Sequence, residues 1–414
     1  MINLEEKQER VLLAGVELQN TADSFVSQMT ELSDLAKTAG ALVIDQFTQK
    51  RERPDARFLI GSGKLEQIRW AIEVGEVDTV IFNERLTPRQ NVNLENALGV
   101  KVIDRMQLIL DIFAMRARSH EGMLQVEQAQ LNYLLPRLVG QGIALSRQAG
   151  GIGSKGPGES KLEMDRRHIR KRIEDIDKAL AKVEKTRETM RKKRNQSQIF
   201  KIGLIGYTNA GKSSMMNALV GDKKQQYERD ELFATLDATT KLVQLHEDFT
   251  VSLTDTVGFI QNLPTELIKA FKSTLEESAN VDLLIHVIDA SNPHHEIHEQ
   301  TVLQIMKELD ILSIPVLNVY NKMDLATGEF APTIAPAIQL SVKTDEGIQW
   351  LRTAILEKLY ECFEHFEVKL PYANAYKLPE LRKIALVQNV EERDEAYLVS
   401  GLIASELSWK LDGY

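Results

Sequence analysis

The spacing of apolar residues divides the chain into regions with different periodicities. Up to residue 118, short β-branched runs alternate with stretches whose apolar residues recur at helical spacing. Strands are predicted at Val11–Leu18, Ala41–Phe47, Asp78–Phe82 and Lys101–Ile103, and helices at residues 23–39, 63–74, 87–97 and 106–117. Because strands and helices alternate with short connections, this region is predicted to be a small parallel sheet covered by helices.

Residues 120–197 show a helical pattern. Met123–Val139 predicts one helix and Leu162–Asn195 a longer one, whose apolar seam runs through Ile169, Ile173, Ile176, Leu180 and Val183. Because this spacing alternates between three and four residues, we expect two antiparallel helices packed along the seam. Residues 140–160 between them contain seven glycines and Pro157, a composition typical of a mobile loop.

Strand–helix alternation resumes after the hairpin. Strands are predicted at Ile199–Ile205, Lys241–Leu245, Thr250–Thr254, Leu283–Asp289, Val316–Tyr320 and Ala337–Leu340. We therefore expect a multidomain α/β protein with four parts. These are a small N-terminal parallel α/β domain (1–119), an antiparallel helical hairpin (120–197), a second α/β domain (198–364) and a small C-terminal α+β domain (365–414).

Composition places the chain among ordinary globular proteins. It has 414 residues, of which 43% are apolar and 27% charged, with a single cysteine. The polar start, the lone cysteine and apolar runs too short for a bilayer favour a cytoplasmic protein without a transmembrane segment. Peripheral association with a membrane is left open, and a monomer is expected.

Charge is distributed unevenly. The net charge is −9, yet residues 147–201 hold 17 lysines and arginines against 8 acidic residues. A basic segment within an acidic chain suggests an anionic partner, although a solvated helix face with ion pairs is the alternative.

One segment matches the phosphate-loop pattern G-x4-G-K-[ST]. It consists of Gly206, Tyr207, Thr208, Asn209, Ala210, Gly211, Lys212 and Ser213. A predicted strand enters it and a predicted helix leaves it, as this motif requires. Lys212 is expected to reach the β- and γ-phosphates and Ser213 to supply an oxygen to Mg²⁺.

Downstream motifs select the guanine base. Asp255, Thr256, Val257 and Gly258 follow a strand, so Asp255 is placed to reach Mg²⁺ through water and the Gly258 N–H to sense the γ-phosphate. Asn321, Lys322, Met323 and Asp324 follow another strand, and the Asp324 carboxylate suits guanine N1–H and its 2-amino group. Ser341, Val342 and Lys343 are expected to close over the base. Together these motifs predict a Ras-like P-loop GTPase domain that hydrolyses GTP to GDP and phosphate.

Longer motifs resemble the HflX family of translational GTPases. They are Phe233-Ala-Thr-Leu-Asp237, Asp255-Thr-Val-Gly-Phe259, the loop at 150–159 with Leu162-Glu-Met-Asp-Arg-Arg167, and Ile60-Gly-Ser-Gly-Lys64. Lys155, Ala238 and Val342 depart mildly from the family pattern. The similarity covers nearly the whole chain.

This resemblance implies a GTPase that binds the large ribosomal subunit and splits stalled ribosomes. It also places the nucleotide at Phe233, Ala234, Thr235, Leu236 and Asp237, with Thr235 as the switch I ligand to Mg²⁺. The residues alone leave Thr235, Thr239 and Thr240 as equal candidates for that ligand.

Two positions bear on catalysis. Phe259 stands where many GTPases carry the glutamine that orients water, so slow intrinsic hydrolysis is expected, with stimulation by the ribosome. Asn209 resembles the asparagine of potassium-activated GTPases, although a role in stabilising the loop turn is favoured over K⁺ binding. The roles predicted to act directly in hydrolysis therefore fall to Lys212, Thr235 and Gly258.

The basic glycine-rich segment is the expected contact with ribosomal RNA. Five residues would touch RNA phosphates: Arg147, Lys155, Lys161, Arg166 and Arg167. Two other functions remain open. One is a GTP-dependent switch acting on a protein partner, and the other an RNA-remodelling NTPase with a second nucleotide at Gly61–Lys64.

Overall fold

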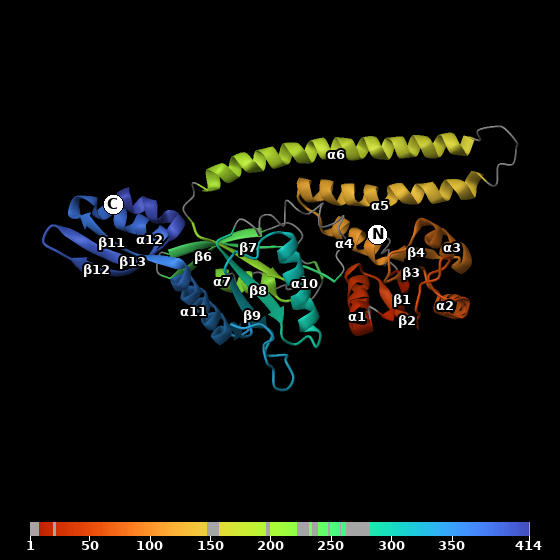
Figure 1. Ribbon diagram of the computed structural model, residues 1–414, viewed down its shortest axis with the longest axis horizontal. Coiled ribbons are helices and arrows are strands. Elements are labelled where there is room, and N and C mark those ends of the chain that lie inside the picture. Colours follow the sequence, from red (N-terminus) through yellow and green to blue (C-terminus); the bar gives the residue numbers. More distant parts are fainter. Residues whose placement is uncertain are drawn as a thin grey trace, which may run out of the picture. The chain divides into compact units, whose positions relative to one another are not determined.

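The computed structural model describes residues 8–19, 22–146, 157–195, 199–221, 232–233, 239–246, 249–256, 258–261 and 281–413 (Figure 1). The chain forms two compact units, which are described one at a time. Residues 1–184 and 262–271 belong to the first unit, and residues 185–261 and 272–414 to the second.

The first unit is built on a four-stranded parallel sheet with the order β2-β1-β3-β4. Its elements alternate as predicted: β1 (Arg10–Glu17), α1 (Ala22–Thr38), β2 (Leu42–Lys50), α2 (Ser62–Gly75), β3 (Thr79–Phe82), α3 (Pro88–Leu98), β4 (Lys101–Asp104) and α4 (Arg105–Arg116). Helix α1 contacts α4, and α2 contacts α3, so each pair covers one face of the sheet. The prediction of a parallel α/β fold is confirmed.

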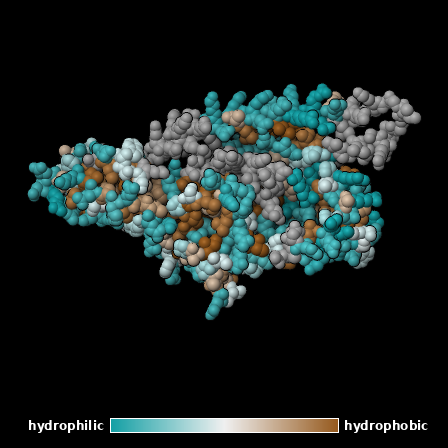
Figure 2. Space-filling view, viewed as in Figure 1, coloured by the Kyte–Doolittle hydropathy of each residue, from teal (hydrophilic) through white to brown (hydrophobic). Residues whose placement is uncertain are grey.

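Two long helices follow this sheet, α5 (His120–Ser146) and α6 (Pro157–Asn195). The predicted seam faces inward, since Ile176 is 1% exposed while most of its neighbours on α6 are exposed. Arg172 of α6 donates to Glu127 of α5 at 2.6 and 2.7 Å. Figure 2 shows hydrophilic residues on the outer side of α6 and hydrophobic residues along its inner side. The hairpin is therefore held by an apolar seam flanked by the Arg172–Glu127 ion pair.

The hairpin helices are longer than predicted. Helix α5 continues through residue 146 and α6 begins at Pro157, so the predicted limits of the loop, 140–160, were too wide. A glycine inside a helix costs only about 1 kcal/mol, and proline is well tolerated at the first helical position, so these residues did not end the helices. Residues 147–156 lie outside the described residues.

The second unit contains a six-stranded sheet with the order β10-β9-β8-β5-β7-β6. All neighbouring pairs are parallel except β6 with β7. The strands are β5 (Lys201–Gly206), β6 (Thr239–His246), β7 (Phe249–Asp255), β8 (Leu283–Asp289), β9 (Val316–Asn321) and β10 (Ala337–Gln339). Helices α7 (Lys212–Val220), α10 (His295–Glu308) and α11 (Asp345–Cys362) accompany them.

A smaller antiparallel sheet ends the chain, with the order β11-β13-β12. Its elements are β11 (Phe363–Pro371), η2 (Tyr372–Lys377), α12 (Leu378–Ile384), β12 (Ala385–Glu392), β13 (Ala396–Ala404) and η3 (Ser405–Gly413). Phe363 packs edge-on against Phe200 and Phe249, with ring centroids 5.1 and 6.1 Å away. The predicted C-terminal α+β segment thus shares a core with the six-stranded sheet.

Candidate nucleotide site

The phosphate loop joins β5 to α7 at the carboxyl edge of the six-stranded sheet. Gly211 has φ +95°, and a Cβ built on it would lie 2.3 Å from Asn321 Nδ2. Both the left-handed conformation and the close approach therefore require glycine. Asn209 also has positive φ, +60°, which asparagine tolerates better than most residues.

Lys212 is the first residue of α7 and is buried. Its Nζ donates to the carbonyl oxygens of Gly206 and Tyr207, at 3.1 and 2.8 Å. Burial lowers the pKa of Lys212 to about 8, although the nearby charge of Asp255 acts in the opposite direction. These two hydrogen bonds hold the Lys212 ammonium group over the phosphate loop.

Ser213 and Asp255 form a direct pair. The Ser213 Oγ donates to Asp255 Oδ2 at 2.6 Å, and Asp255 is 2% exposed. A hydroxyl oxygen and a carboxylate oxygen side by side at the N-terminus of a helix fit Mg²⁺, which prefers hard oxygen ligands. The chemistry of these two residues therefore suits Mg²⁺.

The neighbouring threonines have structural contacts. Thr256 is fully buried, and its hydroxyl donates to the Leu204 carbonyl at 2.7 Å. Thr239 and Thr240 belong to strand β6, where the Thr240 hydroxyl lies 3.0 Å from that of Thr254. The remaining candidate, Thr235, lies outside the described residues.

Of the predicted nucleotide contacts at residues 233–237, only Phe233 belongs to the described part of the chain. Phe233 is buried, at 2% exposed, with φ +55°. Four predicted nucleotide contacts lie outside the described residues: Ala234, Leu236, Asp237 and Val257.

Asn321 connects the phosphate loop to the segment Ser341–Lys343. Its Nδ2 donates to the Ala210 carbonyl at 3.0 Å, and its Oδ1 accepts from the Val342 N–H at 3.1 Å. Lys322 forms an ion pair with Asp289 at 2.9 Å, and its Nζ lies 3.5 Å from Asn209 Oδ1. Asn321 and Lys322 thereby contact the phosphate loop.

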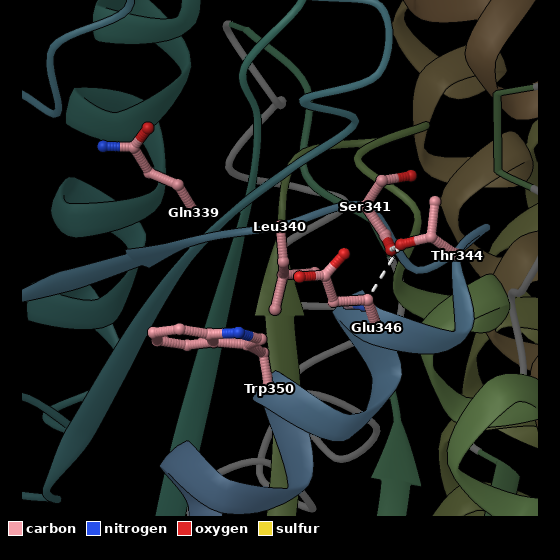
Figure 3. A pocket seen from close by; sticks show the side chains of 7 residues that line it. Gln339, Leu340, Ser341, Thr344, Glu346 and Trp350 are labelled. Atoms are coloured by element: carbon pink, nitrogen blue, oxygen red, sulfur yellow. Dashed lines mark hydrogen bonds between the residues drawn. The ribbon is translucent and has the colours of Figure 1, made fainter.

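The rest of the base motifs lie nearby. The Met323 N–H donates to the Leu340 carbonyl at 3.3 Å, and the Lys343 N–H to Ser341 Oγ at 3.3 Å. Asp324 is exposed. Behind Ser341 lies a hollow of about 250 Å³, with Glu346 and Trp350 of α11 beside it, which no phosphate-loop residue lines (Figure 3).

Gly258 lies directly against the phosphate loop. A Cβ built on it would be 2.8 Å from Thr208 Cα and 3.0 Å from Lys212 Nζ, so only glycine fits. Phe259, which occupies the position of the usual glutamine, is 1% exposed. Its ring is therefore buried.

His298 of α10 lies outside the sequence motifs of the nucleotide site. It is half-buried, and its ring stacks on that of Tyr207 with centroids 3.6 Å apart and planes 3° apart. Burial lowers the pKa of His298 to about 4. Helical spacing alone gave no signal for this contact, because it joins α10 to the phosphate loop.

Outside the nucleotide site, α6 carries the predicted RNA contacts that the structure describes. Arg167 is exposed and Arg166 half-buried, whereas Arg147 and Lys155 lie outside the described residues and the Lys161 side chain is not described. At the predicted second nucleotide position, the Gly61 N–H donates to Gln49 Oε1 at 2.8 Å. That bond suits a structural turn at this position.

The strand–loop–helix unit, the Ser213–Asp255 pair and the Asn321 bridge, set at the carboxyl edge of this sheet, define a P-loop GTPase. Three protein-family models match consecutive parts of the chain. They are "GTP-binding GTPase N-terminal" at residues 26–114, "GTP-binding GTPase Middle Region" at 116–194 and "50S ribosome-binding GTPase" at 201–322. The chain belongs to the HflX family of GTPases, as its relatives show.

Those relatives match over nearly the full length. GTPase HflX of Alkalihalophilus pseudofirmus is 45% identical over 396 residues, covering 95% of this chain and 93% of the relative. GTPase HflX of Escherichia coli K12 is 40% identical, covering 86% and 84%. Among solved structures, that of the SsGBP and GDP complex is 25% identical with a TM-score of 0.50, covering 86% of this chain and 99% of that one. The predicted family and GTPase activity are confirmed.

Within the described parts of the chain, no helix is both long enough and apolar enough to span a membrane.

Proposed function

We propose that this GTPase depends on Mg²⁺, binds the large ribosomal subunit and splits stalled or stressed ribosomes, with hydrolysis stimulated by the ribosome. The observation that carries the enzymatic part is the Ser213–Asp255 pair beside buried Lys212. The family description over residues 201–322 supports the ribosomal part.

Each residue of the nucleotide site has a separate role in the proposed hydrolysis. Lys212 would neutralise charge on the β- and γ-phosphates, and the Gly258 N–H would donate to the γ-phosphate. Ser213 and Asp255, with Thr235 from switch I, would hold Mg²⁺, which when bound neutralises charge on the phosphate oxygens. Asp324 would select guanine, while Asn321 keeps the base motifs fixed to the phosphate loop.

The buried phenyl ring of Phe259 explains why a partner is needed. A ring that is 1% exposed and has no hydrogen-bonding group cannot orient water. Intrinsic hydrolysis should be slow, and contact with the ribosome would order the switch segments.

The basic helix α6 would supply the RNA contact. Arg167 is exposed near the start of α6, and Arg166 is its neighbour. Cationic side chains on a long helix suit the phosphate backbone of RNA, whose binding weakens with salt.

Cosedimentation with ribosomal subunits tests this function. The chain should pellet with large subunits in a non-hydrolysable GTP analogue more than in GDP, and large subunits should raise the hydrolysis rate. Lys212→Ala should lose nucleotide binding. Reversal of charge by Arg166→Glu with Arg167→Glu should weaken subunit binding about tenfold or more.

The matched control is Lys369→Glu with Lys383→Glu, which makes the same change of charge on exposed positions of the C-terminal segment. Equal subunit binding by the α6 variant and this control would contradict the RNA contact. Such a result would favour the alternative of a switch acting on a protein partner.

Activation by potassium is proposed through a single residue, Asn209, as the K⁺ ligand. Because its side chain lies 3.5 Å from Lys322 Nζ, the same residue also has a structural contact. Turnover measured in KCl and in NaCl separates the two roles, since equal rates would leave only the structural one.

A further inference from the structure

Tyr207 is a residue of the phosphate loop whose side chain is turned away from solvent. It is 5% exposed, and its ring lies parallel to the His298 ring of α10. A phosphate-loop position that contributes only backbone to the nucleotide needs no aromatic side chain. The stacked ring therefore calls for a second role.

The Tyr207 hydroxyl reaches the segment that follows Gly258. It accepts a hydrogen bond from the Gln261 N–H at 2.6 Å. Two backbone bonds run alongside: the Thr208 N–H donates to the Phe259 carbonyl at 2.8 Å, and the Phe259 N–H to the Gly206 carbonyl at 3.2 Å. Residues 259–261 are thus hydrogen-bonded to the phosphate loop.

All of this segment is buried. Phe259, Ile260 and Gln261 are 1%, 0% and 4% exposed. A hydrogen bond shielded from water is stronger than an exposed one, so the Tyr207–Gln261 bond restricts the segment more than a surface bond would.

We propose that Tyr207, oriented by its stack on His298, is a positioning residue that sets where the Gly258 N–H meets the nucleotide. The inference rests on the proposed role of Gly258 at the γ-phosphate. Gly258 immediately precedes this segment, and a Cβ built on it would lie 2.8 Å from Thr208 Cα and 3.0 Å from Lys212 Nζ. Any shift of residues 259–261 therefore moves Gly258 against the loop.

The surroundings of His298 keep its ring suitable for stacking. Asp289, at the end of β8, favours the protonated ring, whereas burial and the neighbouring His294 and His295 of α10 disfavour it. Asp289 is itself paired with Lys322 at 2.9 Å. Since burial has the larger effect, the neutral ring is the form that stacks on Tyr207 near neutral pH.

Tyr207→Phe tests the hydroxyl while keeping the ring. In the full chain, single-turnover GTP hydrolysis should slow roughly five- to tenfold, the usual effect of one lost buried hydrogen bond. The Gln261 amide should exchange hydrogen faster, and GDP affinity should stay within about twofold because the loop backbone is kept. Tyr376→Phe, at an exposed tyrosine, is the matched control.

His298→Ala and His298→Phe test the stack. The alanine variant should show the same slow hydrolysis and fast Gln261 exchange, and the phenylalanine variant should restore both because an aromatic ring can still stack. His365→Ala, at an exposed histidine, controls for the loss of an imidazole.

Two results would overturn the inference. One is unchanged hydrolysis in both Tyr207→Phe and His298→Ala. The other is a fall in GDP affinity and melting temperature that matches the fall in rate, since this would indicate a structural role alone. Failure of the proposed nucleotide site is separate, because it would appear as GTP binding retained by Lys212→Ala.

Discussion

At Gly258 the backbone comes so close to the phosphate loop that any side chain would collide with it. A Cβ there would lie 2.8 Å from both the backbone and the methyl group of Thr208. The sequence motif already required glycine at this position, and the structure supplies the steric reason. Glycine is required at position 258 because a side chain there would collide both with Thr208 of the loop and with Lys212 Nζ.

Gly258→Ala should therefore slow GTP hydrolysis by about 100-fold, the usual effect of displacing one preorganised donor. GDP binding should change much less, because the loop that holds the β-phosphate is not altered. Single-turnover hydrolysis and GDP titration measure the two effects. The control is Gly63→Ala, where a Cβ would meet nothing within 4 Å; a normal rate in Gly258→Ala would contradict the steric argument.

His286 links the stability of the second unit to pH. It is 1% exposed, and burial lowers its pKa from 6.5 to about 4, against a raising effect from Asn318. Because the folded pKa lies below the unfolded one, its contribution to stability is complete above pH 6.5. That contribution is lost as the pH falls towards 4.

Between those pH values, this one histidine should remove at most about 3 kcal/mol from the free energy of unfolding. His286→Gln, which cannot titrate in this range, should show a shallower loss of stability with falling pH. Urea unfolding at several pH values measures the slope. The exposed His365→Gln should keep the wild-type slope, and identical slopes in all three proteins would contradict the assignment.

Among the elements, the helical hairpin and the N-terminal sheet share a buried carboxylate, in addition to their apolar contacts. Asp104 is 0% exposed and caps α4, with Oδ1 accepting from the Gln107 N–H at 3.0 Å and the Tyr133 hydroxyl at 2.7 Å. Its Oδ2 accepts from Arg137 at 2.8 Å and from the Leu86 N–H at 3.0 Å. Strand β4, helix α4 and helix α5 therefore meet at this residue.

Asp104→Asn should destabilise the first unit by about 3 kcal/mol, since it leaves the largely enclosed Arg137, whose side chain is 13% exposed, without its charge partner. Amides of α5 should lose protection from hydrogen exchange. The isolated protein should hydrolyse GTP at its usual rate, because the nucleotide site belongs to the other unit. Asp34→Asn, at a surface ion pair, is the control, and unchanged protection of α5 in Asp104→Asn would show that the hairpin is held by its apolar contacts alone.

Comparison of the predicted and observed helices and strands shows what the local pattern of apolar residues can predict. Alternation of strands and helices predicted both sheets because burial on a sheet or helix face has a fixed period. The helix ends at 146 and 157 were missed, because Gly140 and Gly142 are weak signals when a long helix can continue through them. Element type is thus a local property, whereas the length of the hairpin helices is not.

For the molecule as a whole, the net charge conceals an uneven distribution of charge along the chain. Residues 147–201 are strongly basic within a chain of net charge −9. If this segment binds ribosomal RNA, affinity for the large subunit should fall steeply with salt, about tenfold or more from 50 to 200 mM. Affinity for GDP, measured in the same buffers, should change far less, and a flat salt dependence for the ribosome would contradict the RNA contact.

The sequence by itself determined the α/β class, the hairpin, the family and the GTPase activity. It could do so because the phosphate loop, the segment Asp255–Gly258 and the segment Asn321–Asp324 are short. The residues that give each motif its binding role are adjacent in the sequence. The specific assignments of nucleotide, metal and RNA contacts, and the domain limits, remain predictions.

Only the tertiary structure decided which motif residues touch one another. The Asn321–Ala210 bond, the removal of Phe259 from solvent and the stack of Tyr207 on His298 all join segments that are distant along the chain. No periodicity reports such contacts, because they depend on how strands are ordered in the sheet and which loops meet at its carboxyl edge. Sequence thus specified the parts of the GTPase site, and strand order brought them within hydrogen-bonding distance.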